Sequence, residues 1–337
     1  MIEIDKRLSL KLSAASFVCM CMIVGIHVPC RFVTGTCLWY VVTIVKTLFH
    51  VAVPLFFVIS GFLLAGHFGE NQWWGREVRK RFGSLLIPYV IWNFVYFAIS
   101  FVPHSADLGF KSRETWGWGG AILGLDPFDW PALPYLWYVR CLLGYVVCAP
   151  IFLGCCRRRI GLLVIAFEWL AYAVVLMLCK NEWNEINWIH GAFFFSVGIY
   201  LRWNGTWVIR VIQKIPTWLL WLVGVVILFV NMTYISVFGV VNEIGMFSIA
   251  VALWKTISDL ECPKWLTRSA FPIFVLHGGV LVGLRLLFIW CGLQHIVDQS
   301  MMALFMQIVC VVAVCVLVAQ IIRRLSPTLA SLLFGGR

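Results

Sequence analysis

MALFMQIVCVVAVCVLVAQII, residues 302–322, contains no charged residue and is followed at once by Arg323 and Arg324. A helix of about 20 predominantly apolar residues can cross the hydrocarbon core of a bilayer, which is about 30 Å thick. The two arginines that follow belong in water or among lipid headgroups. The stretch therefore predicts a membrane-spanning helix that ends at a basic boundary.

Nine further apolar segments precede this one along the chain. The ten approximate segments are residues 12–30, 45–66, 85–103, 135–154, 160–179, 188–201, 217–235, 240–254, 270–291 and 302–322. The first lacks a small-residue cleavage site, so we expect it to be a retained helix. The longest gap, 104–134, is predicted to form an ordered external loop. We predict a single all-α domain over residues 1–337, a polytopic membrane helix bundle with about ten transmembrane helices.

The composition excludes a soluble globular domain. Apolar residues make up 62% of the chain and charged residues 12%, against about 45–50% and about 25% in soluble domains. The net charge of +11 is attributed to loops that orient the chain. No basic run with interleaved aromatic residues is present, so no nucleic-acid partner is expected. The cysteines are interpreted as small buried apolar residues, and no metal site is expected.

The basic residues alternate between the loops on the two sides of the predicted bundle. One side holds 19 of them and the other holds 5, while Arg140 and Arg285 fall inside helices. Short cytoplasmic loops of membrane proteins are enriched in Lys and Arg. The asymmetry predicts that both termini are cytoplasmic. It assigns Lys46 to the external set and the group at residues 76–81 to the cytoplasmic set.

Titratable side chains at membrane depth are costly, and each is therefore a functional candidate. The predicted helices contain seven such residues: His27, His50, Arg140, Glu168, His190, His277 and Arg285. A neutral imidazole such as that of His27 is a natural general base near pH 7. The alternative is a core histidine that hydrogen-bonds a neighbouring helix. Arg140 has the alternative of extending its guanidinium to the membrane interface.

The segment WWGREVRKRFGSLLIPYVIW, residues 73–92, places Arg76, Arg79, Lys80 and Arg81 just before a predicted helix on the cytoplasmic side. These cations could hold a phosphate-bearing ligand. Topology signalling and contact with anionic lipids explain them equally well. Pro88 is predicted to lie in the first turn of the helix, where proline is tolerated.

Soluble catalytic motifs are missing, because the chain has no phosphate-binding glycine loop, no HExxH and no GxSxG. Any catalytic site has to be built from intramembrane side chains. Several segments together resemble the acyltransferase 3 family of integral membrane acyltransferases. They are the His27 helix, VAVPLFFVISGFLL, KRFGSLLIPYVIW, PYLWYVRCLLGYVVCAPI, FPIFVLH and the final RRLSPTLASLLFGGR, in order from the first helix to the last residue.

The resemblance implies transfer of an acyl group, usually acetyl, from cytoplasmic acyl-CoA to a sugar hydroxyl in a lipid-linked or cell-surface glycan. It implies His27 as the general base, with Arg140 or His277 stabilising the oxyanion or positioning the acceptor. The cations Arg79, Lys80 and Arg81 would hold the CoA phosphates. Acetyl-CoA would be a donor substrate, with no bound cofactor, and the chain would lie among the lipids of a bacterial inner membrane.

Two positions depart from the pattern of this family. Family members usually have an arginine eleven residues before the catalytic histidine, where this chain has Ser16. The second arginine of the usual R-x-x-R is Ser84, three residues after Arg81. Two other function classes stay open on the sequence: a glycan or lipid transporter or flippase, which the lack of an internal repeat disfavours, and a non-catalytic membrane partner.

Overall fold

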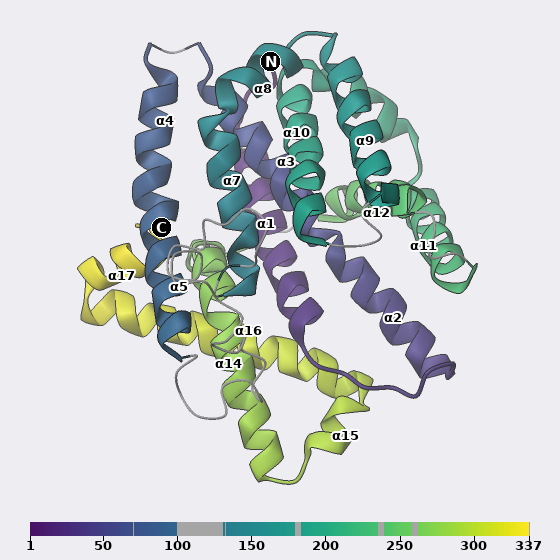
Figure 1. Cartoon of the computed structure of the whole chain (residues 1–337), viewed down its shortest axis with the longest axis vertical. Helices are drawn as coiled ribbons and strands as arrows, with labels where there is room; N and C mark the ends of the chain where they lie inside the picture. The colour runs from purple at the N-terminus through teal and green to yellow at the C-terminus, as the bar shows by residue number, and fades with distance from the viewer. Residues whose placement is uncertain are drawn as a thin grey trace. The chain divides into compact units, whose positions relative to one another are not determined.

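The computed structural model describes residues 1–69, 71–99, 131, 133–178, 183–234, 239–257 and 262–336 (Figure 1). Within these ranges every regular element is a helix and none is a strand. The all-helical prediction is therefore confirmed for the described part of the chain. The predicted loop at 104–134 lies almost entirely outside the described residues.

The helices are described in chain order, divided after Cys156 into a first and a second group. The first group is α1 (Lys6–His27), α2 (Cys37–His50), α3 (Ala52–Leu64), the 3₁₀ helix η1 (Ala65–His67), α4 (Trp73–Arg81), the π-helix η2 (Phe82–Leu86), α5 (Ile87–Ile99), the 3₁₀ helix η5 (Pro134–Leu136), α7 (Trp137–Val147) and α8 (Ala149–Cys156). The second group is α9 (Gly161–Leu178), α10 (Trp183–Lys214), α11 (Thr217–Tyr234), α12 (Gly239–Thr256), α13 (Lys264–Thr267), α14 (Ala270–Trp290), α15 (Gln294–Asp298), α16 (Met301–Leu325) and α17 (Pro327–Phe334).

Each of the ten predicted segments overlaps a helix in the described part of the chain. Four helical runs are long and apolar enough to cross a membrane: Lys6–His27, Cys37–His67, Ala270–Trp290 and Met301–Leu325. Two bent pairs would add two more, Pro134–Val147 with Ala149–Cys156 at 71° and Trp188–Lys214 with Thr217–Val230 at 90°. The described residues thus supply four to six candidate spans by length and composition, and about ten spans stays a prediction.

The second predicted segment, 45–66, is divided in the structure. α2 ends at His50 and α3 begins at Ala52. Pro54 explains the break, because its ring has no N–H and clashes with the carbonyl four residues earlier, which is that of His50.

The third predicted segment begins inside a longer helical run. α4, η2 and α5 follow one another without a gap from Trp73 to Ile99. Pro88 is the second residue of α5, so the prediction that it lies in the first turn of that helix agrees with the bounds of α5, although the helical run itself begins earlier. Pro88 has no N–H to donate to the carbonyl of Ser84. The π-turn η2, which ends just before Pro88, accommodates the missing hydrogen bond, so the helix continues past Pro88.

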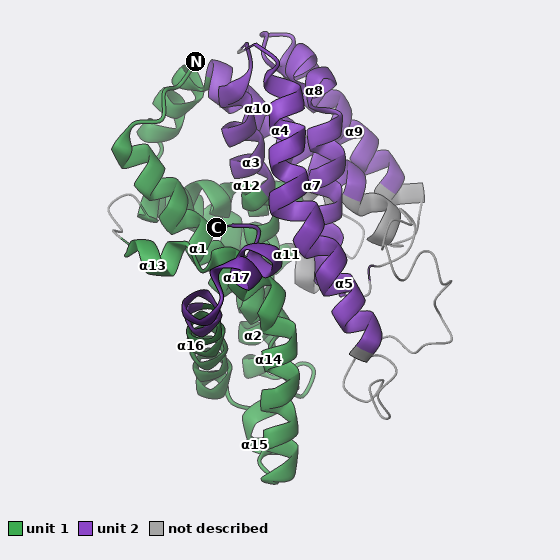
Figure 2. Ribbon diagram, turned by 90° about the vertical axis from the view of Figure 1, so that its left-hand side faces the viewer, with its two compact units in different colours: residues 1–56, 205–319 green, residues 57–204, 320–337 purple. Residues whose placement is uncertain are grey.

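The described residues form two compact units (Figure 2). Unit 1 consists of Met1–Phe56 and Gly205–Ala319, and unit 2 of Phe57–Asn204 and Gln320–Arg337. Each unit therefore combines parts of the chain that are far apart in sequence. The single domain over 1–337 stays a prediction about the whole chain.

In unit 1, α1 packs against α2 and α14, and α11 packs along α12. A core cluster of Val51, Leu228, Met246 and Ile249 joins the end of α2 to the α11–α12 pair. Lipid tails are as apolar as these side chains, so burying apolar side chains does not by itself drive membrane helices together. Van der Waals contact between closely approaching helices stabilises the bundle instead.

Unit 2 shows such a close approach between α3 and α10. A Cβ added at Gly61 would collide with the backbone carbonyl of Phe195, and one added at Gly198 with that of Val58. The two glycines therefore let the two helix backbones touch, as small residues do at helix crossings in membrane proteins. The C-terminal α17 packs on α5, where the Trp92 indole N–H donates to the carbonyl of Leu333 at 3.0 Å.

Candidate active site

Two of the sequence-predicted histidines lie side by side in unit 1. His27 is the last residue of α1, and His277 lies in α14, which packs against α1. Their ring centroids are 5.4 Å apart and the planes are inclined by 35°. His277 is fully buried and His27 is half-buried. The structure therefore brings together two imidazoles that are 250 positions apart in the chain.

Backbone contacts define the tautomer of His277. Its Nδ1 lies 2.7 Å from the carbonyl oxygen of Phe274 and 3.2 Å from that of Ile273. A carbonyl only accepts hydrogen bonds, so Nδ1 carries a proton and donates it. In the neutral ring Nε2 then has a lone pair and is the acceptor. Nε2 of a neutral His277 can therefore accept a proton or contact a cation. It carries no proton that could be donated to an oxyanion.

Lys46 lies next to the catalytic candidate, although the loop charges assign it to an external loop. It belongs to α2, and its Nζ donates to the carbonyls of Ile26 at 3.3 Å and Val28 at 2.7 Å. These carbonyls flank His27 in the chain.

Arg140 belongs to α7 in unit 2 and is only 7% exposed. Its Cζ lies 6.0 Å from the centroid of the Trp188 ring, which is the outer limit of a cation–π contact. Within unit 2 the guanidinium is therefore buried, which disfavours the alternative that it extends to an interface. His27 and His277 belong to the other unit, so the structure describes Arg140 only among its unit 2 neighbours.

The basic cluster is built around an acidic residue in its own helix. Arg79, Lys80 and Arg81 form the last turn of α4, and Glu77 one turn earlier is buried. The Glu77 carboxylate lies 3.8 Å from Lys80 Nζ and 3.5 Å from Arg81 Nε.

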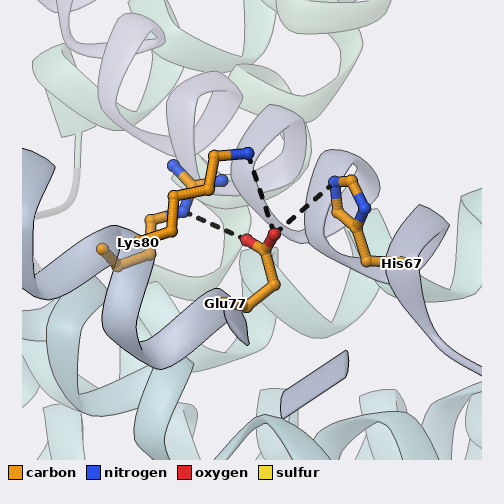
Figure 3. A network of polar contacts seen from close by, with 4 residues as sticks. His67, Glu77 and Lys80 are labelled. Atoms are coloured by element: carbon orange, nitrogen blue, oxygen red, sulfur yellow. Dashed lines mark ion pairs between the residues drawn. The ribbon is translucent and has the colours of Figure 1, made fainter. Parts of the chain in front are cut away.

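His67, from η1, approaches the same Glu77 carboxylate at 3.8 Å. Figure 3 shows Lys80 and His67 on opposite sides of it. Two of the three predicted phosphate-binding cations thus pair with Glu77, while Arg79 is exposed at the helix end.

Two further intramembrane candidates, Glu168 and His190, have structural partners. Ser196 donates to the Glu168 carboxylate at 2.9 Å. His190 has its ring 5.2 Å from that of Tyr172 and 5.0 Å from that of Phe194. These contacts fit the interpretation of helix-to-helix packing in unit 2.

Comparison with known proteins decides the family. The profile of the acyltransferase domain of acyltransferase 3 matches residues 12–324. The chain belongs to the acyltransferase 3 family. The family predicted from the sequence segments is thereby confirmed, and the chain is an acyltransferase.

The succinoglycan biosynthesis protein ExoH of Rhizobium meliloti (strain 1021) is 24% identical over 369 residues, covering 99% of this chain and 94% of that protein. No solved structure matches the chain.

Sequence reasoning missed Lys46 and Glu77. Lys46 stands in the apolar run CLWYVVTIVKTLFH, so a charge at membrane depth was the available signal. Glu77 is the single acidic residue among the cations of α4, four residues before Arg81, which is the spacing of a helical ion pair.

Proposed function

We propose that this chain is a membrane O-acyltransferase that moves an acyl group, preferably acetyl, from cytoplasmic acyl-CoA to a sugar hydroxyl of a lipid-linked or cell-surface glycan. Membership of the acyltransferase 3 family supports the reaction class. A relative named for succinoglycan biosynthesis supports a glycan acceptor. Membrane lipid surrounds the bundle, and no bound cofactor is required.

The proposed arrangement is about ten transmembrane helices in a bacterial inner membrane, with both termini in the cytoplasm. The distribution of 19 basic residues against 5 supports this orientation. Alkaline phosphatase fused after residue 336 should be inactive, and fused after residue 292, beyond α14, it should be active. The reverse pattern would exclude the orientation.

The pairing of His27 with His277 carries the proposed mechanism. A ring nitrogen of His27 takes the proton of the acceptor hydroxyl as its oxygen bonds to the thioester carbonyl carbon. The tetrahedral intermediate then collapses, the C–S bond breaks, and the proton passes to the CoA sulfur. Neutral His277, with its Nε2 lone pair, supports the imidazolium that His27 becomes. Oxyanion stabilisation is left to Arg140 or to other donors.

Donor binding is proposed for the end of α4. Arg79 is exposed at the helix end, and its planar guanidinium suits bidentate contact with a phosphate. Lys80 and Arg81 add positive charge while Glu77 orders their side chains. Ser84 stands where related chains place a second arginine, and Lys11, Arg79 or Lys80 would supply the positive charge in its place.

The length of α1 limits how the donor reaches His27. Its 22 residues span about 33 Å at 1.5 Å per residue, from the predicted cytoplasmic end to His27. Direct transfer therefore requires the thioester arm of CoA to enter the bundle deeply. The alternative is a covalent acyl intermediate that carries the group across.

The test is acetyl transfer by the purified protein in lipid nanodiscs, with labelled acetyl-CoA and a lipid-linked glycan. His27→Ala should lower turnover by about 10²-fold or more, the typical contribution of a general base. His295→Ala, at an exposed residue of α15 in the same unit, is the matched control and should keep full turnover. Full turnover in His27→Ala would remove His27 as the base.

Mass spectrometry of surface glycans from wild-type and deletion cells would identify the acceptor by the loss of one acetyl mass. Unchanged glycan acylation in the deletion strain would favour the non-catalytic partner instead. Movement of a glycan without acetyl-CoA would favour the flippase.

A further inference from the structure

The C-terminal end of α1 presents backbone carbonyls that the helix itself cannot satisfy. The last four carbonyls of any helix have no intrahelical partner. Val28 donates its N–H back to the carbonyl of Val24 at 3.1 Å, which satisfies one of them. At membrane depth each carbonyl left over is costly, because no water is available to it.

Lys46 supplies the missing donor from a different helix. Its Nζ contacts the carbonyl oxygens of Ile26 and Val28 at 3.3 Å and 2.7 Å. The ammonium also complements the partial negative charge at the end of α1. The residue between the two carbonyls is His27. The two peptide groups that Lys46 holds therefore bracket the backbone from which the His27 ring projects.

A second contact fixes the chain just beyond this point. The backbone N–H of Arg31 donates to the carbonyl of Asp298, the last residue of α15, at 2.8 Å. The segment leaving α1 is thus attached to α2 on one side and to α15 on the other. These attachments hold the backbone on both sides of His27.

From this geometry we infer that Lys46 is a positioning residue for catalysis, a clasp across Ile26 and Val28 that holds His27 beside His277. The inference rests on the proposed role of His27 as general base. Lys46 acts through the backbone of α1 and does not touch the substrate. Without the clasp, the end of α1 unwinds and the imidazole leaves the position 5.4 Å from its partner.

The chain contains a matched control for this clasp. Lys255 of α12 donates its Nζ to the carbonyls of Ile212 at 3.1 Å and Ile215 at 2.5 Å, at the end of α10. Both clasps lie in unit 1, and each joins one lysine to two carbonyls at a helix end. Of these two, the Lys46 clasp is the one that brackets a catalytic candidate.

The experiment compares Lys46→Met, Lys46→Arg and Lys255→Met in the nanodisc assay, with turnover expressed per folded molecule. Lys46→Met should lower kcat about 10- to 100-fold, the effect of displacing a catalytic group by about 1 Å, with an unchanged KM for acetyl-CoA. Lys46→Arg retains a cationic donor and should recover most of the kcat. Lys255→Met should lose thermal stability but keep the wild-type kcat.

Two results would overturn the clasp: a kcat of Lys46→Met equal to that of Lys255→Met, or a Lys46→Arg no better than Lys46→Met. If Lys46→Met yields no folded protein, Lys46→Gln, whose uncharged amide is one bond too short to span the two carbonyls, replaces it and should show the same loss of kcat. The proposed function itself is contradicted if the wild-type protein does not transfer acetyl or if His27→Ala is fully active. In either case the proposed role of Lys46 is contradicted as well.

Discussion

The crossing of α3 and α10 in unit 2 allows the packing energy of one contact to be isolated. A Cβ at Gly198 would lie 2.9 Å from both the Phe62 nitrogen and the Val58 carbonyl carbon, and closer still to the Val58 oxygen. Ordinary contact begins at 3.4 Å, and the Val58 oxygen is the limiting atom, so Gly198→Ala has to separate the helices by about an ångström. The neighbouring atoms belong to backbone and cannot rotate away.

Two opposing effects determine the magnitude. Alanine is favoured over glycine within a helix by about 1 kcal/mol. Overpacking costs about 1–3 kcal/mol. Gly154→Ala in α8 of the same unit is the matched control, because nothing lies within 4 Å of its added Cβ. The gain in helix propensity is common to both variants. The difference between their unfolding free energies, about 1–3 kcal/mol, therefore measures the cost of overpacking alone.

The assay is reversible unfolding in detergent, followed by tryptophan fluorescence. Gly154→Ala should match or exceed the wild-type stability, and Gly198→Ala should fall below it. Gly61→Ala acts at the same crossing, so combining it with Gly198→Ala should cost less than the sum of the two single changes. Equal unfolding free energies for Gly198→Ala and Gly154→Ala would refute the close backbone contact between α3 and α10.

Two further predictions concern the basic cluster and the histidine pair. Glu77→Ala removes a buried carboxylate that faces several cations and should cost about 1–3 kcal/mol in unfolding free energy. Lys80→Ala should change it by at most about 1 kcal/mol, because the Lys80 side chain is 63% exposed; similar losses for both variants would contradict a role of Glu77 as the buried anchor. His277→Asn keeps a donor for the Phe274 carbonyl but lacks Nε2, so kcat should fall about 10²-fold at nearly unchanged thermal stability. Normal turnover of His277→Asn would exclude Nε2 from the reaction.

The apolar segments predicted where helices lie but not where they end. The prediction for residues 188–201 fell within α10, which runs from Trp183 to Lys214. The first helix begins at Lys6 and not at residue 12, because the Asp5 side chain caps it by accepting from the Leu8 N–H at 2.7 Å. Hydropathy marks the part of a helix that can face lipid, whereas backbone hydrogen bonds and caps set its length.

The candidate site shows the same division. His27 and His277 were each visible in the sequence as titratable groups in apolar surroundings, and the family segments singled out His27. Neither observation could place the two rings together, because the pairing depends on α1 packing against α14. The clasp of Lys46 was missed because a charge count treats each lysine as belonging to a loop, whereas this one lies within α2.

The sequence by itself determined that this chain belongs to the acyltransferase 3 family and that its described part is helical, with segments apolar enough to cross a membrane, because apolar length and ordered segments are local properties of the chain. The tertiary structure decided which polar groups from different elements meet: His27 with His277, Lys46 with the end of α1, and His67 with Glu77. The physical reason is that an isolated polar side chain at membrane depth is costly wherever it stands. The packing of the helices determines which partner such a side chain contacts, and this packing cannot be predicted from a single segment of sequence.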